Sequence, residues 1–245
     1  PIYDWTPPIA YDNRAALVTE APDYNGDVFV AMPQQQLVSL ASDGGSFQDP
    51  LLIRWSDISD YSSAGSWTAS AVNQAGSFRI PNGSRIVGGF QGALLGYIWT
   101  DIEFWGMQYL GVPFIYGFDK LGSNCGLLAK RAVAEILGLV IWAGHKGIFM
   151  YNGQNVVPVP CSVWDFFYDN RDPAYDASIA AASNSDFNEW ALYFPTYGSA
   201  GENTGYIKYN VITKVWDYGE LDRTALIDRS YVAPCVGTDL TGYLQ

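Results

Sequence analysis

Short apolar segments rich in Val, Ile, Tyr, Phe and Trp recur along the whole chain, separated by Gly, Pro, Asn and Asp. Most are about four to seven residues long, which suits β-strands better than helices. Residues 27–31 and 36–40 form one pair of such segments with a short turn sequence between them. Residues 92–99 and 102–110 form a second pair around the dipeptide Thr100-Asp101. The pattern predicts an all-β protein built from antiparallel hairpins.

The clearest predicted hairpin centres on the dipeptide Asn152-Gly153. The apolar segment 147–151 runs into this dipeptide, and the chain returns as residues 154–160. Asn-Gly favours a tight turn with positive φ angles between two antiparallel strands. The sequence therefore predicts such a turn here.

A related unit follows later in the chain. Residues 205–210 and 213–217 read as another hairpin, and its opening, a glycine followed by aromatic and aliphatic residues, recurs at residues 242–244. Repeated antiparallel units of four short strands are typical of propeller blades, which leave only short sheet edges exposed. The predicted fold is an all-β, β-propeller-like array of antiparallel blades, and a β-sandwich or barrel is the alternative.

One helical signal interrupts the strand pattern. Ser162 and Asp165 fit a capping box, in which each side chain binds a free amide at the helix N-terminus. The helix would continue over residues 166–170 and end before Pro173. Residues 175–182 fit either a further helical turn or the first strand of the next blade. The sequence thus predicts one short helix between blades.

The composition is that of a folded chain with little charge. Of the 245 residues, 49% are hydrophobic, 16% aromatic and 16% charged, which excludes a disordered chain and a long exposed coiled coil. The 25 acidic residues outnumber the 13 basic ones and give a net charge of −12. Because nucleic-acid binding requires a basic surface, we expect no direct binding to DNA or RNA.

Cysteine and histidine offer little chemistry. Cys125, Cys161 and Cys235 lie far apart, without the paired spacing of a zinc or redox motif, so we expect buried thiols and no disulfide framework. The single histidine, His145, lies between two apolar segments and reads as a turn residue, not as a catalytic base. We assign no catalytic, cofactor-binding or metal-binding residue from the sequence.

Three groups of carboxylates are the remaining candidates for catalysis or calcium binding. They are Asp57 with Asp60, Asp101 with Glu103, and Asp169 with Asp172 and Asp176. The last group lacks the order of ligands and the central glycine of the twelve-residue calcium loop. A glycosidase needs two carboxylates that face each other across a sugar, a condition that sequence alone does not test. We interpret all three groups as structural.

Tryptophan is abundant, and its placement favours packing over sugar stacking. Six of the nine tryptophans lie inside apolar segments: Trp55, Trp99, Trp105, Trp142, Trp190 and Trp216. Large aromatic side chains bury much area at little cost in rotamer entropy, which suits contacts between blades. Gly88 and Gly89 follow one predicted strand and precede another, so they indicate a bend and not a nucleotide-binding loop.

The apolar segments are too short to form membrane-spanning helices. The longest, residues 132–143, falls well short of the roughly 20 residues that cross a bilayer. The chain opens at Pro1 and stops at Gln245 within a predicted strand, so we interpret it as a piece of a longer protein. The predicted domains are residues 1–50, an N-terminal segment or part of the first blade, and residues 51–245, a propeller-like domain incomplete at its C-terminal end.

A series of short motifs runs in order through residues 50–245. They are LIRWSD at residues 52–57 with Trp67 downstream, IVGGF at 86–90, YIWTDIEFW at 97–105, GSNCG at 122–126, VIWAG at 140–144, GIFMYNG at 147–153 and VWDFF at 163–167, followed by the segments 188–195 and 206–218. In order and spacing these motifs resemble the stabilisation, hub or nozzle proteins of short-tailed phages.

This resemblance implies a non-enzymatic structural protein of the virion, located in the phage tail. It implies a propeller-containing subunit, several copies of which form a ring below the portal and adaptor proteins and help to form or close the DNA channel. Double-stranded DNA would be passing cargo only, and no catalytic residues carry over. An acidic wall repels a polyanion, so we expect the surplus carboxylates to face the channel. The alternatives are a secreted carbohydrate-binding β-propeller and a glycoside hydrolase.

Overall fold

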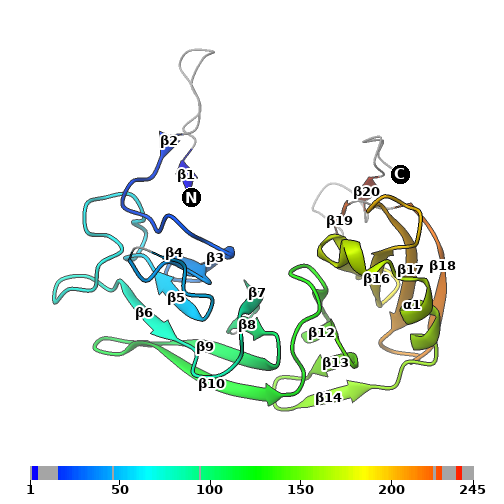
Figure 1. Cartoon of the computed structure of the whole chain (residues 1–245). Helices are drawn as coiled ribbons and strands as arrows, with labels where there is room; N and C mark the ends of the chain where they lie inside the picture. Colours follow the sequence, from blue (N-terminus) through cyan, green and yellow to red (C-terminus); the bar gives the residue numbers. More distant parts are fainter. Residues whose placement is uncertain are drawn as a thin grey trace. The chain divides into compact units, whose positions relative to one another are not determined.

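The computed structural model describes residues 2–4, 16–45, 47–93, 95–222, 225–227 and 236–238. Most of this part forms four antiparallel sheets of four strands each, which follow one another along the chain (Figure 1). In each sheet the strands lie side by side in chain order, which is the arrangement of a propeller blade. The prediction of an all-β, β-propeller-like array of antiparallel blades is confirmed.

We call these sheets blades 1 to 4. Blade 1 contains β3 (Asp27–Ala31), β4 (Gln36–Leu40), β5 (Leu52–Trp55) and β6 (Gly76–Arg79), and blade 2 contains β7 (Ile86–Gln91), β8 (Gly96–Thr100), β9 (Glu103–Gly111) and β10 (Ile115–Ser123). Blade 3 contains β11 (Val133–Ile136), β12 (Leu139–Gly144), β13 (Gly147–Tyr151) and β14 (Val156–Val159), and blade 4 contains β15 (Ala180–Asn184), β16 (Glu189–Pro195), β17 (Asn203–Asn210) and β18 (Trp216–Glu220). Two short pairs are separate: β1 (Tyr3–Asp4) with β2 (Ala16–Leu17), and β19 (Ala225–Ile227) with β20 (Val236–Thr238).

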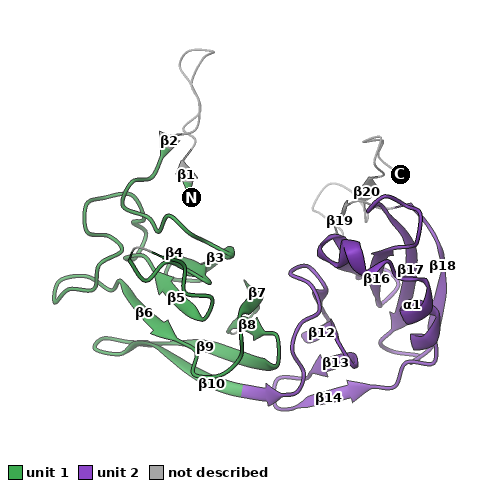
Figure 2. Cartoon of the chain, viewed as in Figure 1, with its two compact units in different colours: residues 1–120 green, residues 121–245 purple. Residues whose placement is uncertain are grey.

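The chain divides into two compact units, residues 1–120 and residues 121–245 (Figure 2). Unit 1 contains blade 1 and most of blade 2, and unit 2 contains blades 3 and 4. The boundary falls within β10. Among the described residues, no helix is long and apolar enough to cross a membrane.

In unit 1 the first strands of the two blades, β3 and β7, lie against each other. Gly89 in β7 permits close packing here, because a Cβ atom at this position would lie 2.6 Å from the Tyr97 carbonyl oxygen and 2.8 Å from Leu40 Cδ1. The Gly89 N–H also donates to Asp27 Oδ2 at 3.2 Å. Gly88 and Gly89 lie within β7, at a β-bulge, and not between two strands as the sequence predicts.

In unit 2 the first strands of blades 3 and 4 make the corresponding contact. The Ala181 N–H in β15 donates to the Arg131 carbonyl oxygen at 2.6 Å, and Arg131 forms a parallel bridge with Ala180. The same first-strand contact therefore joins the two blades in each unit.

The predicted packing role of tryptophan is confirmed at five of the six positions. The buried residues, with exposed fractions from 0% to 7%, are Trp55, Trp99, Trp105, Trp142 and Trp190. Trp216 is the exception, because it is only half-buried in the outer strand β18. Its indole N–H donates to the Pro160 carbonyl oxygen at 2.8 Å, and its ring packs on Tyr209.

The predicted hairpins are present, with shifted ends. Strands β3 and β4 match the prediction residue for residue. Strand β8 begins only at Gly96, because the Gly92 N–H donates to the Leu95 carbonyl oxygen and closes a turn before it. Strands β17 and β18 form the predicted third hairpin, whereas the expected repeat at residues 242–244 lies outside the described residues.

The two turns of blade 3 give one confirmed prediction and one correction. His145 is exposed in the two-residue turn between β12 and β13, as predicted. The Asn152-Gly153 dipeptide does not form a two-residue turn, because β14 starts only at Val156. The Asn152 side chain instead accepts the N–H groups of Gln154 and Asn155 at 3.0 and 2.9 Å and holds a longer loop.

The predicted helix is present, but its predicted cap is wrong. Helix α1 spans Trp164–Asn170 with Val163 at the N-cap position and no side-chain capping bond, so Ser162 lies one residue too early. A 3₁₀ helix, η1 (Pro173–Ser178), follows, and its N-cap Asp172 accepts the Ala174 N–H at 3.0 Å. Residues 175–182 thus contain both alternatives, a helical turn and the start of β15.

Candidate functional site

Asp57 and Asp60, the first candidate pair, stabilise a surface turn. Asp57 Oδ1 accepts the N–H groups of Ile58 at 2.8 Å and Gln74 at 2.9 Å. Asp60 Oδ1 accepts the Ser63 N–H at 3.0 Å, and this bond is the main reason that the pKa of Asp60 lies below its usual value. Both carboxylates therefore satisfy backbone amides, as the structural interpretation predicts.

Asp101 and Glu103 bind different parts of the chain in and beside blade 2. Asp101 accepts the N–H of Ser84 at 2.9 Å and its hydroxyl at 2.7 Å. Burial acts to raise the pKa of Asp101, but the bonds from Ser84 and Arg85 outweigh it and lower the pKa. Glu103 accepts the Trp105 indole N–H at 3.1 Å and pairs with the Lys120 ammonium at 3.4 Å. The two side chains hold strands and turns of blade 2 together.

The third acidic group lies around the helical segment of unit 2. Asp172 caps η1, Asp169 is exposed, and Asp176 pairs with Arg171, whose Nε lies 3.2 Å from Asp176 Oδ1. Burial raises the pKa of Asp176 despite the positive charge of Arg171. Within the described ranges, no three His, Cys, Asp or Glu side chains are grouped so that they could hold a metal ion.

Neither of the two cysteines in the described part of the chain forms a disulfide. Cys125 is buried and Cys161 half-buried, while Cys235 lies outside the described residues. Burial raises the pKa of Cys161 to about 11, so this thiol is protonated at neutral pH. A protonated thiol is a weak nucleophile, so Cys161 does not have the properties of an activated cysteine.

The hairpin formed by β9 and β10 is the most distinctive feature of unit 1. Both strands are nine residues long, but β9 pairs with β8 only as far as Met107. The outer half of the hairpin therefore extends past the shorter strands of its own blade, towards β6 of blade 1 (Figure 1).

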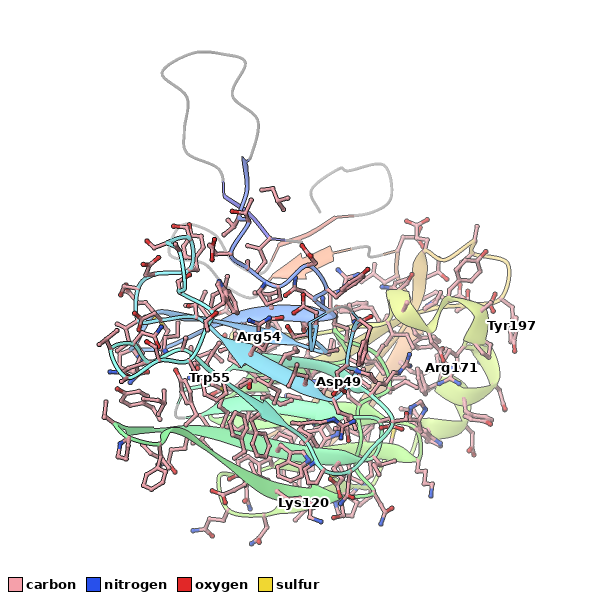
Figure 3. All side chains as sticks on the ribbon, turned by 60° about the vertical axis from the view of Figure 1, so that its left-hand side comes forward. Asp49, Arg54, Trp55, Lys120, Arg171 and Tyr197 are labelled. Atoms are coloured by element: carbon pink, nitrogen blue, oxygen red, sulfur yellow. The ribbon has the colours of Figure 1, made fainter. Side chains whose placement is uncertain are left out.

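Aromatic contacts fix this hairpin on blade 1. Phe118 of β10 stacks on Phe78 of β6, with ring centroids 4.2 Å apart, and Tyr116 packs edge-on against Trp55 at 5.2 Å. Trp55, labelled in Figure 3, lies on β5. The Tyr109 hydroxyl donates to Gln74 Oε1 at 2.8 Å. We call Trp55, Phe78, Tyr109, Tyr116 and Phe118 the aromatic cover of unit 1.

The tip of the hairpin is apolar and exposed. Leu110, Val112 and Phe114 are 56%, 73% and 75% exposed, and residues 110–114 contain no charged side chain. The sequence predicts the flanking strands but not this exposed surface, because an apolar residue in a strand segment is expected to be buried. The break at Gly111 and Pro113 was the available signal for a turn.

Unit 2 has a different aromatic surface beside its helical segment. The Arg171 guanidinium lies 5.4 Å from the Phe167 ring centre and 5.8 Å from that of Tyr168. The Tyr197 N–H donates to the Asn170 carbonyl oxygen at 3.3 Å, which joins the loop after β16 to the end of α1; Figure 3 labels Arg171 and Tyr197. The Arg171 charge is therefore already paired with the Asp176 carboxylate and lies near two aromatic rings.

Comparison with known proteins supports the fold and nothing finer. No family model and no curated protein matches the sequence. Among solved structures the chain is similar to dihydro-heme d1 dehydrogenase NirN in complex with DHE, a β-propeller, with a TM-score of 0.51 and 12% identity over 88% of this chain and 42% of that chain. A protein from Bacteroides fragilis that is thought to be exported gives a TM-score of 0.38 and 10% identity, over 86% of this chain and 65% of that chain.

The chain thus spans less than half the length of NirN. At 12% identity the likeness concerns the fold alone. It agrees with the four blades and defines the class of this molecule: a β-propeller-like chain.

Proposed function

We propose that this chain is a non-enzymatic structural subunit of a tailed-phage virion, of the tail hub, nozzle or stabilisation type. The observation that carries the proposal is the ordered series of motifs over residues 50–245. Several of these motifs coincide with blade strands, such as LIRWSD with β5 and GIFMYNG with β13. The residues of these motifs serve packing and turns, which suits a structural subunit.

The carboxylates support a structural role. Asp57, Asp60 and Asp101 accept backbone amides, and Glu103 and Asp176 pair with cations. A glycoside hydrolase uses one carboxyl group as acid and a second as base or nucleophile on the two sides of a sugar. These five side chains already have structural partners, so they give the hydrolase alternative no support.

The apolar tip of the β9–β10 hairpin supports assembly. We assign as its partner a neighbouring copy of this chain in a ring. Rings are built from heterologous interfaces, in which one patch of a subunit contacts a different patch of the next. A projecting, uncharged tip suits such a contact, and a permanent interface would bury more than roughly 1,000 Å².

The acidity of the chain supports passage of DNA without binding. With 25 acidic and 13 basic residues, the chain gains little from counterion release on contact with a phosphate backbone. In this proposal the surplus carboxylates face the channel, and DNA crosses it as cargo.

The experiment is to determine whether the protein is part of the virion. Quantitative mass spectrometry of purified, intact phage particles should find this chain at a fixed copy number relative to the portal protein. Its absence from the particles would overturn the proposal whatever the fold.

A matched pair of variants tests the assembly surface. Phe114→Ser changes the hairpin tip of unit 1, and Phe187→Ser changes a similarly exposed phenylalanine in a turn of unit 2. We expect native mass spectrometry to show loss of the oligomer for Phe114→Ser and its retention for Phe187→Ser. Equal behaviour of the two variants would exclude the tip as the contact.

A further inference from the structure

The sequence contains three Asn-Gly dipeptides, and the fold places them in three different surroundings. They are Asn25-Gly26, Asn82-Gly83 and Asn152-Gly153. In such a dipeptide the glycine nitrogen can attack Cγ of the asparagine side chain and close a succinimide ring, because glycine has no Cβ atom to hinder the approach. The reacting groups are the same at all three sites. Differences in their reactivity within the folded protein therefore come from the structure around them.

The first dipeptide is held by hydrogen bonds on both reacting groups. The Gly26 N–H donates to the Leu40 carbonyl oxygen at 2.8 Å. Asn25 Nδ2 donates to the Pro22 carbonyl oxygen at 2.8 Å, and Asn25 Oδ1 accepts the Ser39 hydroxyl. Attack on the side chain would break these bonds, so the fold protects this site.

The second dipeptide lies among carboxylates. Asn82 Nδ2 donates to Glu103 Oε1 at 3.5 Å, and a Cβ atom at Gly83 would lie 3.0 Å from Asp101 Oδ1. Ring closure places negative charge on the oxygen of the asparagine amide. Neighbouring negative charges raise the energy of that state, so the surroundings of Asn82 slow the reaction.

The third dipeptide has hydrogen-bond donors where the negative charge develops. Asn152 Oδ1 accepts the N–H groups of Gln154 and Asn155 at 3.0 and 2.9 Å. Backbone N–H groups directed at such an oxygen stabilise tetrahedral intermediates in enzymes. Hydrogen bonds to an ionised acceptor are about twice as strong as those to a neutral one, so these two bonds stabilise the intermediate more than the starting amide.

The donors and the nucleophile are arranged before the reaction. The Tyr151 hydroxyl donates to the Gly153 carbonyl oxygen at 3.0 Å and so fixes the peptide group whose N–H, that of Gln154, binds Asn152. The Asn152 N–H donates to the Asn155 carbonyl oxygen at 3.3 Å and closes the loop. The Gly153 N–H donates no hydrogen bond to the described part of the chain, and Asn152 and Gly153 are both exposed. A base from the solvent can therefore reach this N–H.

We propose that Asn152 is a site of spontaneous deamidation. A base from the solvent removes the Gly153 N–H proton, and the nitrogen forms a bond to Asn152 Cγ. The bond from Cγ to Nδ2 then breaks, and the leaving nitrogen takes up a proton and departs as ammonia. Water opens the succinimide at one of its two carbonyl groups, which gives aspartate or isoaspartate at this position. The reaction needs only water and base, and it does not depend on the proposed virion role.

The two products differ in their effect on blade 3. Aspartate keeps an oxygen that accepts the Gln154 and Asn155 N–H groups, so the loop between β13 and β14 is retained. Isoaspartate adds one CH₂ group to the main chain of the loop and removes the side chain that holds it. Either product adds a negative charge to the chain.

The experiment compares the three dipeptides in one sample. The full chain is incubated in mildly alkaline buffer made with H₂¹⁸O, folded in one sample and in guanidinium chloride in another. Peptide mapping by mass spectrometry locates the ¹⁸O in each new carboxyl group, and electron-transfer fragmentation distinguishes isoaspartate from aspartate. The denatured sample gives the reactivity of each dipeptide without the fold.

We expect folding to change the three rates in different directions. Asn152 should react about tenfold faster in the folded protein than in the denatured chain, because two hydrogen bonds strengthen in the intermediate. Asn25 and Asn82 should react more slowly in the folded protein. A rate at Asn152 that is equal or lower in the folded protein, or a folded rate at Asn82 as high as that at Asn152, would overturn the proposal.

A matched pair of variants tests the amide donors. Gln154→Pro removes one of the two N–H groups, whereas Gln154→Ala keeps it and changes only an exposed side chain. We expect Gln154→Pro to lower the folded rate at Asn152 about threefold to tenfold and Gln154→Ala to leave it unchanged. Equal rates in the two variants would refute the role of the donors. If circular dichroism shows that Gln154→Pro does not fold, Tyr151→Phe, which releases the same peptide group, should lower the rate at Asn152, and an unchanged rate would refute that role.

Discussion

Units 1 and 2 have the same arrangement of blades, but different segments of the chain lie over these blades. In each, two four-stranded blades meet through their first strands. In unit 1 a long hairpin of blade 2 lies across blade 1 and is fixed by aromatic rings. In unit 2 the chain between the blades forms α1 and η1, and Phe167 of α1 packs edge-on against Phe194 of β16 at 4.9 Å. The shared arrangement of four-stranded sheets therefore does not determine which segments of the chain cover the blades.

The difference has a physical reason in the length of the connections. Blade 2 follows blade 1 after only a short turn, so its own outer strands are the segment available to cover the neighbouring blade. Blades 3 and 4 are separated by residues 160–179, which is enough chain for two helical turns. We expect the stability of unit 1 to depend on a few aromatic side chains and that of unit 2 to be spread over more contacts.

The largest expected effect is on the aromatic cover. Trp55→Ala removes a buried ring that contacts Tyr116 and Phe118, and we expect it to lower the free energy of unfolding by about 3–5 kcal/mol. The corresponding variant of unit 2, Trp216→Ala, removes a half-buried ring and should lower it by about 1–2 kcal/mol. Urea unfolding followed by circular dichroism measures both. Equal losses would contradict the idea that unit 1 relies on its aromatic cover.

This contrast also shows what the sequence can and cannot predict. The strands and their order are predictable, because alternation of apolar residues and turn residues is local information. The cap of α1 and the Asn152 loop are not predictable, because several nearby side chains and backbone amides can form the hydrogen bonds that define each of them. The sequence predicts that Trp55 packs, but not which rings it contacts, because Trp55 and Tyr116 are distant in sequence and meet only in the folded blades.

The next effect concerns two carboxylate–lysine pairs of different burial. In unit 1 the Glu103 side chain is 7% exposed and binds Lys120 and the Trp105 indole, so Glu103→Ala should lower the free energy of unfolding by about 2 kcal/mol. In unit 2 the Glu189 and Lys208 side chains are 25% and 28% exposed, so Glu189→Ala should lower it by about 0.2–1 kcal/mol. Chemical denaturation of both variants measures the difference. Glu103→Gln keeps an acceptor and should restore part of the loss; no recovery would argue against the hydrogen bond to Trp105.

Asp101 in unit 1 and Asp176 in unit 2 should respond to pH with opposite signs. The lowered pKa of Asp101 means that its contribution is present above its usual pKa of 3.8 and is lost as the pH falls through the lower folded value. The raised pKa of Asp176 means that the folded state binds a proton more readily, so stability rises as the pH falls from neutral through that raised value.

Thermal unfolding between pH 7 and pH 3 tests these signs. The stability difference between the native protein and Asp101→Asn should shrink towards low pH, and that between the native protein and Asp176→Asn should grow in favour of the native protein. If both stability differences change with pH in the same direction, the pKa values of Asp101 and Asp176 are not shifted in opposite directions.

The smallest expected effect on stability is at the hairpin tip. Phe114 is 75% exposed and Phe187 64% exposed, so Phe114→Ser and Phe187→Ser should each change the free energy of unfolding by less than about 0.5 kcal/mol. The reason is that neither ring is removed from water on folding of the single chain. Denaturation at low protein concentration measures this intrinsic stability. At high concentration an assembling chain gains stability from association, and that gain should disappear only in Phe114→Ser. If the stability of Phe114→Ser increases with protein concentration as much as that of the native protein, the hairpin tip is not the contact between copies. The aromatic cover would then serve only the internal packing of unit 1.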